Sequence, residues 1–168
     1  MDTDLRQEYI KLDDWSKVEF LTQLEFKENS DKWLLIDSII TDVNEYDLAR
    51  IEAFKILEIA DIPQYHKNIL AKSLFNILIS EDDYDIKNYA ACALVNFIEY
   101  SFIEQLCIER LLDPEEDIDL RYCFFTALLK MKNRDELCKI LKELLSDADF
   151  SRNAKCNLEK LFNISSSK

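Results

Sequence analysis

The stretch YDIKNYAACALVNFIEYS, Tyr84–Ser101, decides the fold that the sequence predicts. Its apolar and small residues recur at helical spacing, and the acidic run Glu81-Asp82-Asp83 directly precedes it. This pattern predicts one amphipathic helix that follows an acidic turn and buries a face of small side chains. An acidic turn followed by a helix recurs both before and after this stretch, which predicts an array of similar units.

The composition favours a single all-helical domain. The chain has 168 residues, of which 48% are hydrophobic and 33% charged, so it is long and apolar enough to fold around a core. It contains no glycine, which excludes the glycine-rich loops that hold phosphates and removes the favoured residue of tight hairpins. Helices tolerate that lack best, and we expect about ten of them.

The charge and the apolar runs limit the partners and the location. A net charge of −13 disfavours nucleic acid and anionic membranes as partners and suits a basic protein. The first residues, MDTDLRQEY, are acidic and show no signal peptide. No apolar run approaches the ~20 residues that span a membrane. We therefore expect a cytoplasmic protein.

Four segments align as the second helices of successive helix pairs. Their first buried residues are separated by 30 to 38 residues, and the positions eight residues later are also apolar. Such periods are typical of helical-hairpin arrays. We expect N-terminal capping helices in 1–29, four helix pairs in 30–163 and a frayed tail at 164–168. The aligned first positions are Leu48, Ile86, Leu120 and Phe150, and the later positions are Ile56, Leu94, Leu128 and Leu158.

Tryptophans and cysteines are expected in the core. Both Trp15 and Trp33 fall on apolar stripes at helical spacing. No two of the five cysteines have the spacing of metal ligands or of a redox motif, so we interpret them as small buried side chains in a reducing compartment. They are Cys92, Cys107, Cys123, Cys138 and Cys156.

The aligned helices resemble those of the HEAT-repeat family. That family's second helix begins with an acidic turn, an apolar residue followed by Arg, and then small residues. Leu120-Arg121 keeps this pair, Leu48-Ala49-Arg50 has the Arg one place late, Ile86-Lys87 substitutes Lys, and Ala90-Ala91 supplies small residues. The resemblance implies a right-handed α-solenoid of stacked antiparallel helix pairs whose second helices line a concave, partner-binding surface.

The acidic turns and nearby tyrosines are the candidate binding residues. If the pairs stack in register, the turns share one edge and form a negative ridge for a basic partner. Two alternatives are plain helix capping by a solvated edge and calcium binding, although the runs lack the glycine and terminal glutamate of an EF-hand loop. The candidate residues are Glu81, Asp82, Asp83, Tyr84, Asp85, Glu115, Glu116, Asp117, Asp119, Tyr122, Asp147 and Asp149.

No catalytic signature stands out. His66 is the only histidine and has no evident nucleophile or metal partner in the sequence. We therefore expect a non-enzymatic binding protein without cofactor or metal. By family-level analogy, the most specific expectation is an immunity protein of a bacterial contact-dependent inhibition system, whose acidic face covers a basic nuclease toxin. The alternatives are a HEAT-like adaptor or assembly scaffold and, in another class, an enzyme such as a DNA-base-processing solenoid or a chromophore-lyase relative.

Overall fold

The structure is a computed structural model that describes residues 5–24 and 31–165. Within these residues the chain forms ten α-helices, two short 3-10 helices and no strand, which confirms the predicted all-α class. The elements are α1 (Leu5–Tyr9), α2 (Asp14–Leu24), α3 (Lys32–Thr41), α4 (Asp47–Ile59), α5 (Gln64–Ser80), α6 (Tyr84–Ala93), η1 (Leu94–Asn96), α7 (Ser101–Leu112), α8 (Ile118–Leu128), α9 (Arg134–Glu143), η2 (Leu144–Ser146) and α10 (Ser151–Ser165).

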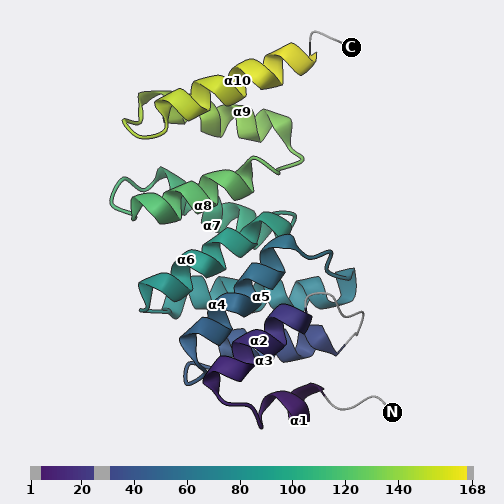
Figure 1. Ribbon diagram of the computed structural model, residues 1–168. Helices are drawn as coiled ribbons and strands as arrows, with labels where there is room; N and C mark the ends of the chain where they lie inside the picture. The colour runs from purple at the N-terminus through teal and green to yellow at the C-terminus, as the bar shows by residue number, and fades with distance from the viewer. Residues whose placement is uncertain (1–4, 25–30, 166–168) are drawn as a thin grey trace.

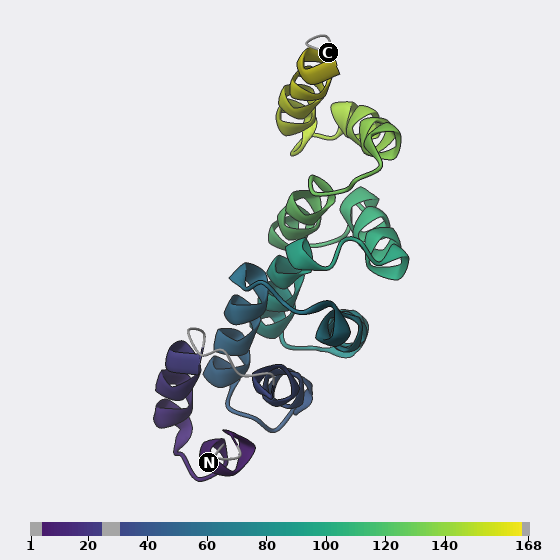
Figure 2. The same cartoon turned by 90° about the vertical axis from the view of Figure 1, so that its right-hand side faces the viewer.

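The helices alternate between two layers, which Figure 2 shows nearly end-on. In one layer α1, α3, α5 and α7 contact one another in succession, and in the other α2, α4, α6 and α8 do the same. The last two helices, α9 and α10, pack on each other. The helix pairs therefore follow one another along the long axis of the molecule, with α1 and α10 at opposite ends (Figure 1).

One continuous core lies between the layers, with buried residues from Leu5 on α1 to Leu158 on α10. Several buried positions of the even-numbered helices hold alanine, including Ala53 on α4, Ala90 on α6 and Ala127 on α8. Small side chains at these positions let neighbouring helices approach closely. Their burial therefore matches the face of small side chains that the sequence predicts.

The central helix is shorter than predicted. The expected single helix 84–101 ends at Ala93, continues as the 3-10 helix Leu94–Asn96, and gives way to α7 at Ser101. The Asn96 side chain donates hydrogen bonds to the carbonyl oxygens of Leu57 and Glu58 at the end of α4, both at 2.8 Å. These contacts fix the backbone of α6 against α4 where the α-helix ends.

The first of the four aligned segments is displaced by one residue from the predicted alignment. Leu48 is 42% exposed, whereas the next residue, Ala49, is fully buried like Ile86 and Phe150. Eight residues after Ala49 lies Leu57, so all four segments carry a buried leucine at that position. The Arg of this segment is therefore in register with Arg121 rather than one place late.

Two residues predicted in the core lie at the surface. Trp15 is 62% exposed because α2 faces the core with Phe20, Leu21 and Leu24, while Trp33 is buried as predicted. Cys156 is also exposed, and Cys92, Cys123 and Cys138 are only half-buried, so Cys107 alone of the five cysteines is buried as predicted.

The predicted terminal segments fall partly outside the described residues. This applies to 1–4 and 25–29 of the capping segment and to 166–168 of the tail. Within the described part, α10 continues to Ser165, so the first two residues of the expected frayed tail are helical.

Candidate functional site

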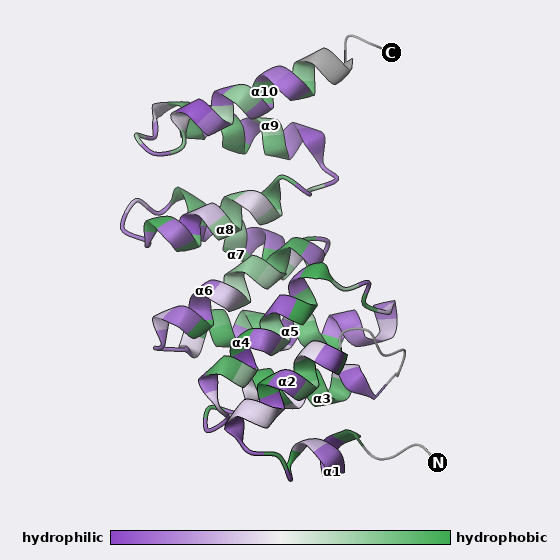
Figure 3. Ribbon diagram, in the orientation of Figure 1, coloured by the Kyte–Doolittle hydropathy of each residue, from purple (hydrophilic) through white to green (hydrophobic). Residues whose placement is uncertain are grey.

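The four acidic turns lie along one edge of the molecule. They occupy residues 42–47, 81–85, 113–119 and 147–149, at the junctions from each odd-numbered helix to the next even-numbered one from α3 onward. All four are on the left in Figure 1, and Figure 3 colours the turns before α6, α8 and α10 hydrophilic. We call these residues the acidic edge.

The acids predicted to bind a partner all belong to the acidic edge. Tyr84 begins α6 within it, and Tyr122 lies one turn further into α8. The structure thus brings together side chains that are far apart in the sequence: Glu81, Asp82, Asp83, Tyr84 and Asp85 from the second turn; Glu115, Glu116, Asp117, Asp119 and Tyr122 from the third; Asp147 and Asp149 from the fourth.

Arg50 ties the second acidic turn to the preceding helix pair. Its side chain is 3% exposed, and Nη2 donates to the carbonyl oxygen of Ile40 at 3.2 Å and to Glu81 Oε2 at 2.6 Å. The first bond satisfies a carbonyl at the C-terminal end of α3, where a cation is favoured. Burial alone would raise the pKa of Glu81, but the Arg50 guanidinium and backbone N–H groups hold this pKa below its usual value.

Arg121 has the same role two helix pairs later. Its Nε donates to the carbonyl oxygen of Leu111 at 2.9 Å, and Nη2 bonds to Asp147 Oδ2. In both sites the arginine and its carbonyl acceptor are ten residues apart. The pKa of Asp147 is also lowered, because the Arg121 bond and the N–H groups of Asp149 and Phe150 outweigh the effect of burial.

Aspartates cap the helices that follow the last three turns. Asp83 accepts a hydrogen bond from the N–H of Ile86 at 3.0 Å, Asp117 from Leu120 at 3.3 Å, and Asp147 from Phe150 at 3.1 Å. A carboxylate here satisfies backbone donors that would otherwise lack partners, and it complements the helix dipole. The capping interpretation is therefore confirmed for these three residues.

Tyr84 links the second and third turns. Its hydroxyl lies 3.0 Å from Asp117 Oδ1 and 3.2 Å from Asp119 Oδ2, so it donates to this carboxylate pair. Its ring is 43% exposed. Together with the bonds of Arg50 and Arg121, this contact joins each of the last three turns to the helix pair before it and so fixes the spacing of charges along the acidic edge.

Three of the acids predicted to bind a partner form no side-chain hydrogen bond or ion pair in the described part of the chain. The side chains of Asp82, Asp85 and Glu115 are exposed, and within residues 5–24 and 31–165 they form no hydrogen bond or ion pair. By contrast, Glu116 pairs with Arg110 at 3.1 Å. Asp149 is 3.9 Å from Arg121 and mostly exposed.

The tyrosines near the edge differ in exposure. Tyr122 is 40% exposed and packs on Phe150, with ring centroids 4.6 Å apart. Tyr89 is half-buried, and the Lys55 ammonium lies 5.7 Å from its ring centroid. Tyr89 is therefore more enclosed than Tyr84.

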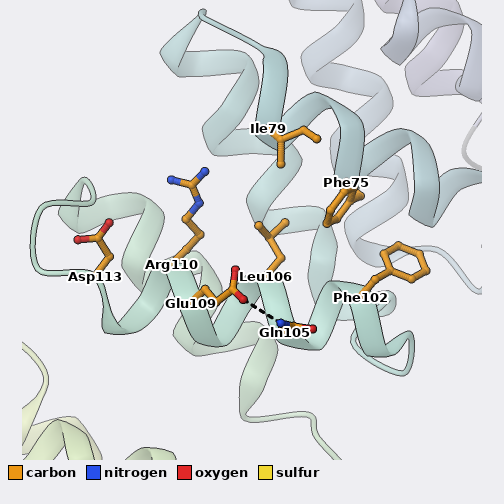
Figure 4. Close-up of a pocket in the computed structure, with 8 residues that line it drawn as sticks. All are labelled: Phe75, Ile79, Phe102, Gln105, Leu106, Glu109, Arg110 and Asp113. Carbon is orange, nitrogen blue, oxygen red and sulfur yellow. Dashed lines mark hydrogen bonds between the residues drawn. The ribbon is translucent and has the colours of Figure 1, made fainter.

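A second candidate surface is a groove between α5 and α7, drawn in Figure 4. Phe75, Ile79, Phe102 and Leu106 supply apolar contact, and the phenylalanine rings are 5.6 Å apart. Figure 4 shows the charged Arg110 and Asp113 at the end away from Phe102. The groove has a volume of about 510 Å³.

A hollow outside the acidic edge has mixed charge. This hollow of about 590 Å³ is lined by three lysines and three glutamates, namely Lys67, Lys130, Lys132, Glu58, Glu99 and Glu104. Lys67 pairs with Glu99 at 3.5 Å. Negative charge is therefore concentrated along the acidic edge, while this hollow has mixed charge.

Sequence reasoning missed a pair of cysteines. Cys92 on α6 and Cys123 on α8 are half-buried, and their Sγ atoms lie 2.8 Å apart. The sequence held one signal, because both residues fall on second helices of consecutive pairs and are separated by close to one repeat.

Residues 5–24 and 31–165 contain no group of three or more His, Cys, Asp or Glu arranged to hold a metal ion. The same residues include no helix with the length and hydropathy of a membrane span. Comparison of the chain with family models, curated proteins and solved structures gave no match.

Proposed function

We propose that the protein is a non-enzymatic binding module, a short HEAT-like right-handed α-solenoid whose acidic edge contacts a cationic surface of another protein. The two-layer order of the helices supports the solenoid description. The equivalent contacts of Arg50 and Arg121 support a repeat of the HEAT type, because the family's second helix carries an arginine at this place.

The observation that carries the proposal is the set of acids left without an internal role. Capping and ion pairing account for Glu81, Asp83, Asp117 and Asp147. They do not account for Asp82, Asp85 and Glu115. Neighbouring carboxylates repel these three side chains, and no hydrogen bond or ion pair of their own in the described chain offsets the repulsion. A cationic partner removes this repulsion and gains association rate through electrostatic steering.

The edge is also suited to binding because it is pre-organised. The contacts from Arg50, Tyr84 and Arg121 hold successive turns at fixed spacing. A partner therefore meets carboxylates that need little further ordering, which lowers the entropic cost of binding. The exposed rings of Tyr84 and Tyr122 add apolar contact area beside the charges.

The specific form that we propose is a cytoplasmic immunity protein. A nuclease toxin has a basic substrate-binding surface, and an acidic edge that covers this surface would block entry of the nucleic acid. The roles follow from chemistry: the free carboxylates pair with lysines and arginines of the toxin, while the arginine-linked carboxylates hold the edge in shape.

A second function, an adaptor that binds a peptide or subunit, is favoured by one observation. The groove of Figure 4 exposes Phe102 and Ile79 beside charged groups, a composition suited to an amphipathic segment of another protein. Binding in this groove would depend on apolar contact and so vary little with salt. Binding at the acidic edge would weaken steeply with salt.

The test begins with the neighbouring genes. An immunity gene is expected directly downstream of a gene for a large secreted toxin. The C-terminal domain of that toxin should form a tight complex with this protein and lose its nuclease activity in the complex. The complex should form more slowly as salt rises from 50 to 500 mM, because the Debye length falls from ~14 to ~4 Å over this range. A complex whose association is independent of salt, or a toxin that stays active when bound, would contradict the proposal.

A further inference from the structure

Cys92 and Cys123 form a site of their own, separate from the acidic edge. They lie on neighbouring helices, α6 and α8, and their Sγ atoms are 2.8 Å apart. We propose that these two thiols form a reversible disulfide when the protein meets a low-molecular-weight disulfide, so that the pair is a site of oxidative modification.

The geometry requires little movement. The S–S bond of a disulfide is about 2.0 Å long, so the two sulfurs need to approach by less than about 1 Å. The helices that carry them already pack against each other. Asn88 Oδ1 lies 3.6 Å from Cys123 Sγ and helps to hold that thiol beside α6.

A small oxidant can reach the pair. Both cysteines line a hollow of about 240 Å³ on the surface of the even-numbered layer, together with Glu58, Val95 and Tyr122. Neither side chain is fully buried. By contrast, Cys107 is fully buried, and burial raises the pKa of its thiol to about 12, so it is protected from this chemistry.

The two thiols have different roles. The hydrogen bond between them lowers the pKa of Cys92, against the opposing effects of burial and of the Glu58 charge. The same hydrogen bond, with burial, raises the pKa of Cys123. Because the thiolate is the nucleophile in exchange, the sulfur that accepts the shared hydrogen bond attacks first; either sulfur can accept it, and we assign this place to Cys92 because its pKa is the lowered one.

The reaction is balanced thiol–disulfide exchange. The Cys92 thiolate attacks one sulfur of the small disulfide RSSR, forms a mixed disulfide and releases one RS⁻. The Cys123 sulfur then attacks Cys92 Sγ and displaces the second RS⁻. The two thiol protons pass to the two released thiolates, so two protein thiols are oxidised and RSSR is reduced to two RSH.

The charge around the site predicts which disulfide reacts fastest. Glu58 lines the hollow and the whole chain carries a net charge of −13. We therefore expect cationic cystamine to react faster than neutral 2-hydroxyethyl disulfide, and the latter faster than anionic glutathione disulfide.

The bond would fix α6 to α8. It would close a loop between residues 31 apart in the sequence, which restricts the unfolded chain. For a chain of this size we expect the thermal midpoint to rise by about 5–10 °C on oxidation and to return on treatment with dithiothreitol.

The experiment treats the purified full chain with cystamine and maps the products by peptide mass spectrometry. The expected product is a peptide pair joined through Cys92 and Cys123, two hydrogens lighter than the reduced peptides, with the raised thermal midpoint. The Cys123→Ser variant should trap one cysteamine adduct on Cys92. A variant with Cys138→Ser and Cys156→Ser, the matched control, should still form the bond.

Two outcomes would overturn the proposal. One is a wild-type protein in which Cys156 takes up cysteamine while Cys92 and Cys123 stay reduced. The other is a Cys92–Cys123 bond whose formation leaves the thermal midpoint unchanged, because such a bond would not fix α6 to α8. Both measurements use the wild-type chain, so they hold even if a serine variant folds poorly.

Discussion

Arg121 of α8 bonds to Asp147, and the same carboxylate caps α10. One acid of the fourth turn therefore joins the last helix pair to the one before it. Because Arg121 is almost completely buried, the bond is largely shielded from solvent. Asp147, one of the acids that the sequence predicts to bind a partner, thus stabilises the fold.

The first prediction concerns this buried arginine. Replacing Arg121 with Met removes the cation, leaves Asp147 without its partner and frees the carbonyl of Leu111. We expect the free energy of unfolding to fall by about 2–4 kcal/mol, measured by urea titration. The control is Arg152→Met, at an exposed position of α10, which should change the free energy of unfolding by less than about 0.5 kcal/mol. Equal effects of the two variants would contradict the structural role of Arg121.

The second prediction separates capping from charge at Asp117. Asp117→Ala removes the acceptor for the N–H groups of Asp119 and Leu120 and should destabilise the protein by about 1 kcal/mol. Asp117→Ser keeps a capping oxygen and should recover most of this loss. Thermal unfolding of the two variants measures the difference, and an equally unstable serine variant would argue against the cap.

The third prediction is a dependence of stability on pH. Asp147 has a lowered pKa in the folded state, so its contribution is fully present above about pH 5 and is lost as the pH falls through the lowered value. Asp147→Asn keeps a capping side chain but removes the charge. The difference in unfolding free energy between wild type and this variant should be largest at pH 7 and shrink below about pH 4. A difference that is constant with pH would exclude the charge as its cause.

The helices and turns could be predicted because their signals are local. Helical spacing and the acidic turns act within a few residues, so the all-α class follows from the chain alone, whereas only the structure shows which acids cap a helix, namely Asp83, Asp117 and Asp147. The shared edge also follows, once each turn is assigned to the same end of a helix pair.

The remaining features depend on tertiary contacts. Leu48 is apolar and fits the spacing, yet Ala49 is the buried residue, because burial on α4 depends on how this helix packs against α2, α3 and α6. The division of the acids into bonded and free ones depends likewise on which arginine or tyrosine reaches each turn. The early end of the central helix depends on a bond from Asn96 to α4.

The central claim is that the free acids of the acidic edge steer a cationic partner. The most direct measurement compares the rates at which two variants associate with the toxin domain at low salt. Both variants lose the same amount of charge. Asp82→Asn, Asp85→Asn and Glu115→Gln remove three free acids of the edge, whereas Asp61→Asn, Asp135→Asn and Glu159→Gln remove exposed acids elsewhere. We predict that the first variant associates about 3–10-fold more slowly than the wild type and that the second stays within about 2-fold, with both thermal midpoints nearly unchanged. Equal association rates for the two variants would contradict the account.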